Sequence, residues 1–216
     1  AKDGKIYERT AILEWFRKKD GDATSPSTGK VIGTELLPAV QVRNTIESLI
    51  QSGAIEGELA EAWTKKLERE KEVNEIRAKA EGGDGYSMWR LGVRYRQGVL
   101  GLRENAEQAR AWYERSAAVH DPRGMSAFGE ALLHGIGGSA DTSLGLVLVT
   151  EAAANGSDFG AYTLGKCFFY GDFGLTKDPV RARYWLKKVV DGEYEYKHLP
   201  DKAIAEAANW LRELDQ

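Results

Sequence analysis

Apolar residues follow a helical spacing along most of this chain. In Glu8–Lys18, Ile12 and Trp15 fall on one helical face and the charged residues fall on the other. A highly charged segment, Glu58–Ala80, carries its apolar residues in a single stripe, and Asp201–Leu214 does the same near the end of the sequence. The pattern predicts a mainly α-helical protein.

From Gly85 onward the hydrophobic pattern repeats. An apolar residue followed by glycine occurs 37 and then 36 residues further on, at Leu91-Gly92, Phe128-Gly129 and Leu164-Gly165. The segments that begin at Ala109, Gly145 and Ala182 recur at 36 and 37 residues. Self-similarity at this period is typical of a solenoid of helix pairs. Glycine inside a helix costs about 1 kcal/mol relative to alanine, so we expect each repeated glycine to face a closely packed partner helix.

The repeated unit, LGxxYxxG followed by AxxWYxxxA, resembles the Sel-one-like repeat, a relative of the tetratricopeptide repeat. The middle copy is degenerate and lacks the aromatic pair of its second helix. The resemblance implies three antiparallel helix pairs over residues 85–198. Each pair buries its apolar face only against its neighbours, so the array needs closed ends. We expect a charged linker and capping helix within residues 52–84 and a capping helix within 199–216. The alternative for the charged helix is a coiled coil that forms a homodimer.

The first 51 residues form a different module. A DGKIYER turn leads into the first helix, a SPSTGK loop follows, and LLPAVQVRNTIESLI is an extended entry into a second helix. In order and spacing these parts resemble the U-box, the metal-free relative of the RING domain of ubiquitin ligases. The resemblance implies a small α+β domain over residues 1–51, without the apolar segment that normally precedes the DGKIYER turn.

The resemblance also implies roles for individual side chains of this module. In a U-box, polar residues of the two loops hold the fold together where a RING domain uses zinc. Here these residues are Asp3, Glu8, Arg9, Ser25 and Thr28; the alternative is that they are solvated turn residues. The surface that docks a ubiquitin-conjugating enzyme would include Pro26, Ile12, Trp15 and Lys30.

Charge and composition exclude several other classes of function. The net charge of −3 provides no basic field for nucleic acid or an anionic membrane. One cysteine, Cys167, cannot form an internal disulfide, and three scattered histidines offer no clustered ligand set for zinc. No apolar run approaches the roughly 20 residues of a membrane span. We therefore expect a cytoplasmic or nuclear protein that uses no metal or cofactor.

The resemblance supplies a function that the residues alone do not. It implies a ubiquitin-protein ligase that docks a ubiquitin-charged conjugating enzyme through the U-box. A protein substrate or a chaperone-like partner would be recruited by the repeats. Such a ligase transfers ubiquitin by positioning the reactants, without a covalent intermediate of its own. We expect weak transfer from this chain, because the apolar first loop of the docking surface is not in it.

Partner-binding residues are expected on the first helix of each pair, which lines the concave face of such a solenoid. The candidates that are not needed for the core are Arg90, Arg94, Arg96, Glu130, Tyr162 and Lys166. Two alternatives to a ligase remain. One is a non-catalytic interaction scaffold with a degenerate U-box, and the other is a hydrolase site in the repeats, for which no convergent catalytic set is visible.

Overall fold

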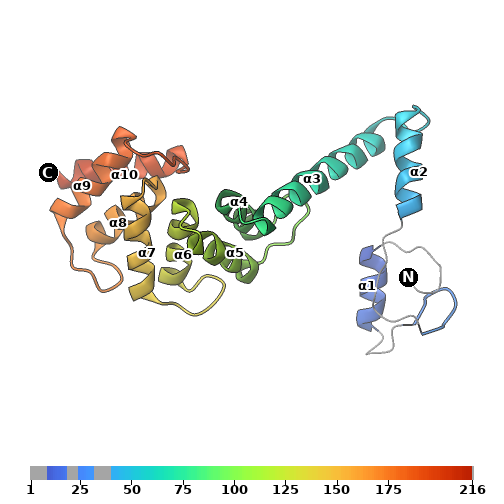
Figure 1. Cartoon of the computed structure of the whole chain (residues 1–216), viewed down its shortest axis with the longest axis horizontal. Coiled ribbons are helices and arrows are strands. Elements are labelled where there is room, and N and C mark those ends of the chain that lie inside the picture. Colours follow the sequence, from blue (N-terminus) through green and yellow to red (C-terminus); the bar gives the residue numbers. More distant parts are fainter. Residues whose placement is uncertain (1–8, 19–23, 32–39, 216) are drawn as a thin grey trace. The chain divides into compact units, whose positions relative to one another are not determined.

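A computed structural model describes residues 9–18, 24–31 and 40–215. These residues form ten α-helices and two isolated β-bridges, and no strand occurs within the described ranges. The chain divides into two units, Ala1–Trp63 and Thr64–Gln216 (Figure 1). The first unit holds α1 (Arg9–Lys18) and α2 (Val40–Gln51), and α3 (Glu58–Glu81) runs from the first unit into the second.

The second unit contains three helix pairs and a final helix. The pairs are α4 (Gly85–Gln97) with α5 (Ala106–Ala118), α6 (Pro122–His134) with α7 (Thr142–Ala154), and α8 (Asp158–Tyr170) with α9 (Pro179–Asp191), followed by α10 (Asp201–Leu214). The pairs succeed one another along the unit (Figure 1), and the first helices contact each other, α4 with α6 and α6 with α8. This is the helix-pair solenoid that the sequence period predicts.

Local capping interactions set the ends of the repeat helices. Before α5, Asn105 Oδ1 accepts a hydrogen bond from the Gln108 N–H at 2.9 Å. Before α9, Asp178 Oδ1 accepts from the Val180 and Arg181 N–H groups, both at 3.0 Å. Each cap satisfies backbone N–H groups in the first turn of its helix. The first helices of the pairs end at glycines in the left-handed conformation, where a side chain would be strained: Gly98, Gly135 and Gly171.

The repeated glycines mark the closest approach of paired helices. A β-carbon built on each would lie 2.5 to 2.7 Å from a side-chain carbon of the second helix, a distance that real side chains do not show. The contacts join Gly92 to Tyr113, Gly129 to Val149 and Gly165 to Leu186. The second residue of each contact occupies the same position of its repeat, so one contact is made three times. This is the close packing expected from glycine within a helix.

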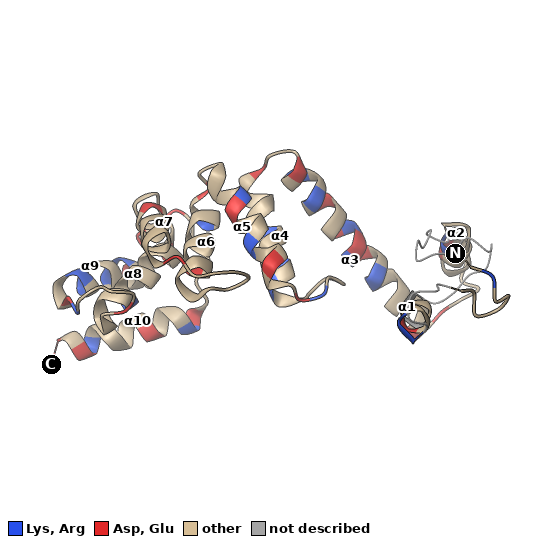
Figure 2. Ribbon diagram, turned by 90° about the horizontal axis from the view of Figure 1, so that it is seen from below, with Lys and Arg blue, Asp and Glu red and all other residues tan. Residues whose placement is uncertain are grey.

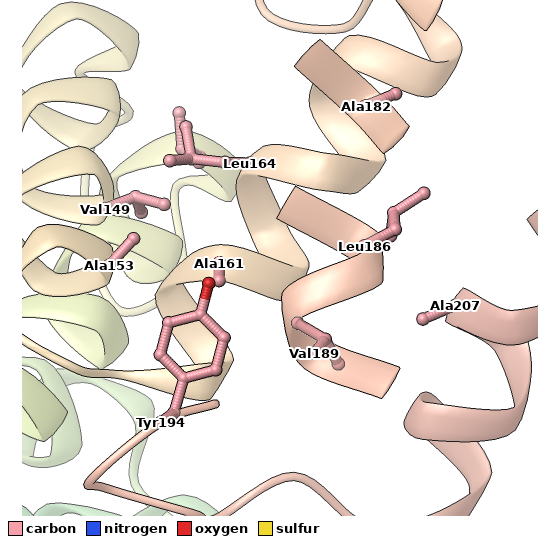
Figure 3. Close-up of a cluster of buried hydrophobic side chains, with 10 residues drawn as sticks. Val149, Ala153, Ala161, Leu164, Ala182, Leu186, Val189, Tyr194 and Ala207 are labelled. Carbon is pink, nitrogen blue, oxygen red and sulfur yellow. The ribbon is translucent and has the colours of Figure 1, made fainter. Parts of the chain in front are cut away.

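The core lies between successive pairs and is covered at both ends. Val149, Leu164 and Leu186 are 0–3% exposed and belong to one cluster, to which α10 adds Ala207 (Figure 3). At the other end, Ile76 of α3 packs against residues of α4. Along the rest of α3, acidic and basic residues alternate on the surface (Figure 2). Helices at each end of the array shield its apolar faces from water.

In the first unit, hydrogen bonds centred on Ser25 close the loop after α1. Ser25 is 2% exposed; its N–H donates to the Lys30 carbonyl at 2.8 Å, and its Oγ accepts from the Thr28 N–H at 2.9 Å. Trp15 Nε1 donates to the Thr24 carbonyl at 2.9 Å, which ties the loop to α1. Thr24 also forms one of the isolated β-bridges. Apart from that bridge, the regular secondary structure in the described part of this unit is helical, and the α+β architecture of a U-box is not shown in it.

Candidate binding groove

One face of the second unit carries a groove with a volume of about 360 Å³. Its apolar walls come from the first helices of the pairs, with Trp89 and Val93 from α4, Ala127 from α6 and Phe159 from α8. Trp89 and Val93 are four residues apart, so they lie on the same face of α4. Tyr113 of α5, which is 7% exposed, also forms part of the lining. The repeat architecture therefore assembles one apolar hollow from residues of successive pairs.

A cluster of aromatic rings and one guanidinium borders the groove. The Trp89 ring lies 5.7 Å from the Tyr86 ring and 4.6 Å from the His198 ring. The Arg123 guanidinium lies 4.3 Å from the centre of the Tyr86 ring and forms two side-chain hydrogen bonds with Asp121, one of them at 2.9 Å. The hydrogen bonds to Asp121 raise the pKa of Arg123. Arg123 is thus held in place by its neighbours and acts as a fixed part of the wall.

The segment that follows α9 lies along the edge of this groove. The Tyr196 N–H donates to the Gly156 carbonyl at 3.0 Å, and the Asp158 N–H donates back to the Tyr196 carbonyl at 3.2 Å. The Asp158 carboxylate, in a residue that is 6% exposed, accepts from the N–H groups of His198 and Leu199 at 2.8 and 3.0 Å. Burial lowers the pKa of His198, which outweighs the opposing effect of Asp158. Its ring therefore packs on Trp89 in the neutral form at pH 7.

Helix α10 covers part of α8 and closes that end of the face. Tyr162 of α8 donates its hydroxyl hydrogen bond to Glu206 of α10 at 2.7 Å. The Trp210 ring of α10 lies 5.6 Å from Tyr162 and 5.7 Å from Phe169. Tyr162 was expected to bind a partner; the capping helix engages its hydroxyl group and packs against its ring, and a partner-binding role for it stays a prediction.

Two of the expected partner-binding residues, Arg96 and Glu130, line the groove. The Arg96 guanidinium lies 3.9 Å from the Glu104 carboxylate, and its side chain is 45% exposed. Glu130 is half-buried and makes no hydrogen bond or ion pair with any residue that the structure describes. Burial raises the pKa of its carboxyl, and the nearby His134, Arg96 and Lys166 act in the opposite direction. The groove thus contains one half-buried carboxylate that makes no hydrogen bond with a described side chain and has His134, Arg96 and Lys166 nearby.

The other expected partner residues of the repeats have different surroundings. Arg90 and Arg94 both approach the Glu72 carboxylate of α3, at 3.2 and 3.4 Å. They join α4 to the capping helix, and their expected role in partner binding stays a prediction. Lys166 is half-buried on α8 and lies outside the groove lining.

Three groove residues were not singled out from the sequence. Trp89 occupies a position of the repeat that is Ser126 in the second copy and Tyr162 in the third. Arg123 follows the N-cap residue Asp121 and Pro122, and no sequence pattern at this position indicates a binding role. His198 comes from a connecting segment outside the repeats, and only its hydrogen bonds to Asp158, 40 residues away, bring it to the groove.

The first unit places only some of the expected docking residues at its surface. Pro26 and Lys30 are exposed and Trp15 is half-buried. Ile12 is 2% exposed, so its expected docking role is corrected: the side chain belongs to the interior. Of the expected polar network, Ser25 and Thr28 are joined as described above. Asp3, Glu8 and the side chain of Arg9 lie outside the described residues.

No metal-binding cluster and no reactive thiolate are found among the residues that the structure describes. No group of three or more His, Cys, Asp or Glu side chains in those ranges could hold a metal ion. Cys167 is 1% exposed, and burial raises the pKa of its thiol to about 11, which disfavours the reactive thiolate. Within the same ranges, no helix is both long enough and apolar enough to cross a membrane.

Comparison with known proteins identifies the repeats. The Sel1 repeat matches residues 85–119, 122–157 and 159–190, which correspond to the three helix pairs. Chitin synthase regulatory factor 3 of Schizosaccharomyces pombe is 26% identical over 113 residues. That match covers 50% of this chain and 12% of the yeast protein, so the chain spans only a small part of this relative's length.

One solved structure shows the same architecture, and a second was found as a weaker match. A Sel1 repeat protein from Oxalobacter formigenes is 26% identical, with a TM-score of 0.51, over 66% of this chain and 98% of that one. A protective antigen of uropathogenic Escherichia coli strains, which displays an SLR fold, is 23% identical with a TM-score of 0.48. That match covers 83% of this chain and 41% of the antigen.

Proposed function

We propose that this chain, which carries three Sel1 repeats between residues 85 and 190, is a non-catalytic scaffold that binds a protein partner. The partner would lie in the groove lined by α4, α6 and α8. The observation that carries the proposal is the groove itself, an apolar hollow of about 360 Å³ bordered by Trp89, Arg96 and Glu130. Its volume lies near the lower end of ligand sites, roughly 300–1,000 Å³, which suits a short segment of a partner.

Two further observations support binding over catalysis. The groove combines aromatic and apolar side chains with charged and polar ones, which is a composition that occurs in recognition sites. The relative in Schizosaccharomyces pombe is named a regulatory factor. A protein that regulates another through helical repeats acts by contact, so the likeness favours a binding role.

Blocking the groove tests this proposal. Ala127 lines the groove, and Ala127→Arg would fill it with a long charged side chain. Ala111→Arg is the matched control, because Ala111 is exposed in the middle of α5. Each full chain is immobilised, exposed to cell lysate, and its bound proteins are quantified by mass spectrometry. We expect a set of proteins held by the wild type and Ala111→Arg but lost by Ala127→Arg at unchanged melting temperature. Identical sets on all three proteins would refute groove-mediated binding.

We also propose, as a second function, that the first unit takes part in ubiquitin transfer by docking a conjugating enzyme. The support is the resemblance of residues 1–51 to a U-box, together with the closed loop around Ser25. That loop is tied to α1 through Trp15 and carries Pro26 and Lys30 at the surface. Such a unit would act by holding the charged conjugating enzyme in a reactive pose, with the repeats recruiting the substrate or a chaperone-like partner.

An autoubiquitination assay with purified ubiquitin, activating enzyme and a panel of conjugating enzymes tests this second function. Pro26→Ala should lower transfer about tenfold, the loss expected for one interface contact worth about 1.4 kcal/mol. Pro179→Ala serves as the control, since Pro179 is also exposed but lies in the first turn of α9. No transfer by the wild type, or equal transfer by all three proteins, would remove the U-box from the function and leave the scaffold.

A further inference from the structure

The chain's own segment after α9 illustrates how this face holds a polypeptide. Tyr196 pairs with Ser157 in a parallel β-bridge, and its N–H and carbonyl groups are both used. The N–H groups of His198 and Leu199 then donate to one carboxylate, that of Asp158. Extended segments are commonly bound through main-chain hydrogen bonds of this kind. The segment borders the groove at His198 and leaves the part between α4 and α6 open.

Glu130 is the one acidic side chain among the described residues that line the groove. Arg123 has Asp121, and Ser126 and Ser157 are hydrogen-bonded to each other. Glu130 forms no hydrogen bond or ion pair with any described residue, although it is half-buried. A carboxylate that is partly removed from water and forms no hydrogen bond with the protein is unfavourable, and an incoming cation relieves part of that cost.

The surroundings of Glu130 fit a cation carried on an apolar stem. Val93, Ala127 and Phe159 supply apolar surface to the same groove as the Glu130 carboxylate. Lysine and arginine bury their methylene stems against such surface and keep the charged end at a polar group. The Arg96 guanidinium, also in the groove lining, already lies 3.9 Å from the Glu104 carboxylate, and its side chain is 45% exposed. An acidic ligand side chain would find no comparable unpaired cation in a buried position among the described lining residues.

We propose that the groove binds an extended polypeptide segment of its partner that places one lysine or arginine side chain against Glu130. This inference rests on the proposed scaffold function and adds the chemistry of the segment that the scaffold recognises. The stem of the basic side chain packs between Val93, Ala127 and Phe159. The charged end forms a hydrogen-bonded ion pair with the Glu130 carboxylate.

Selection from a displayed library of random nonapeptides on the immobilised full chain tests the proposal. On the wild type, sequencing should show lysine or arginine enriched at one position about tenfold, as expected for a charged hydrogen bond worth about 1.4 kcal/mol. Glu130→Gln should abolish that enrichment, and Glu130→Lys should replace it by aspartate or glutamate. Glu151→Gln is the control, because it removes the same charge from an exposed position on α7.

A single selected peptide then gives the coupling directly. Its affinity is measured by fluorescence anisotropy with the basic residue present and with that residue replaced by methionine. The replacement should weaken binding to the wild type about tenfold and to Glu130→Gln less than about twofold. Equal weakening in both proteins would place the basic residue elsewhere and overturn the proposal.

The failures of the two proposals are distinguishable. Peptides selected without a basic preference, or no selected peptide at all, would overturn this inference. The scaffold function would stand in either case if Ala127→Arg still abolished partner capture. Partner capture unaffected by Ala127→Arg would instead refute the scaffold groove itself.

Discussion

Replacing Gly165 by alanine tests whether the repeated glycine exists for helix packing. Gly165 lies in the interior of α8, where alanine is the better helix former by about 1 kcal/mol. Its added β-carbon would lie 2.7 Å from both Cγ and Cδ2 of Leu186, a residue that is 0% exposed. Carbon atoms in contact prefer separations of about 3.5–4.0 Å, so α8 and α9 would have to move apart.

The expected cost follows from these two opposing effects. Inserting a carbon into a well-packed core costs about 1–3 kcal/mol. The helix-forming advantage of alanine offsets about 1 kcal/mol of that cost. A net loss of about 1 kcal/mol should lower the melting temperature by about 2–4 °C in a domain of this size.

A double-mutant cycle with Leu186→Ala gives the decisive comparison. Without the Leu186 branch, the nearest remaining atom to the new β-carbon is the Leu186 backbone nitrogen at 3.4 Å, which is an ordinary contact. Gly165→Ala should therefore destabilise the wild type but stabilise the Leu186→Ala protein, as measured by urea unfolding followed by far-ultraviolet circular dichroism. Stabilisation of the wild type, or the same change in both backgrounds, would refute the packing explanation.

Three further predictions concern charges and hydrogen bonds. Glu130→Gln should raise the melting temperature at pH 7, because burial raises the pKa of this carboxyl and makes its ionisation in the folded chain unfavourable. The higher melting temperature of the variant should vanish as the pH falls toward about 4, where the carboxyl is protonated. A difference that does not depend on pH would contradict this explanation. Glu72→Gln removes the partner of Arg90 and Arg94 and should cost less than about 1 kcal/mol of unfolding free energy, with the difference shrinking in high salt. Ser25→Ala removes the buried hydroxyl that accepts from the Thr28 N–H and should lower the unfolding free energy of the first unit by about 1–2 kcal/mol. The loss would be measured as faster hydrogen exchange at residues 24–31. Unchanged exchange would show that the loop does not depend on the Ser25 hydroxyl.

Much of the repeat fold could be predicted because its determinants are local or periodic. The caps at Asn105 and Asp178 involve residues two or three positions apart, and such contacts are visible in the sequence. The glycine of each first helix recurs with the period of the repeat, which indicates a close helix–helix contact in every copy. The identity of the opposing residue varies from tyrosine to valine to leucine, yet the contact survives, because the glycine and not its partner sets the approach.

The candidate site could be predicted only in part. Arg96 and Glu130 were found because they lie on the exposed side of first helices at positions that the repeat core does not use. Tyr162 fits the same rule but is covered, because the placement of α10 depends on how Trp210 packs against α8. In the first unit, Ile12 and Trp15 lie on one helical face, and spacing could not tell which of them is buried.

The sequence by itself therefore determined the helices, their pairing and the three-fold recurrence of one contact, since these depend on residues close together or spaced by the period. The tertiary structure alone decided which part of the shared face stays open. That outcome depends on two hydrogen bonds, from the His198 N–H to Asp158 and from the Tyr162 hydroxyl to Glu206. Each joins residues about 40 positions apart, a separation that differs from the repeat period. No local preference encodes such contacts, so the open groove and its unpaired Glu130 emerge only when the chain is folded.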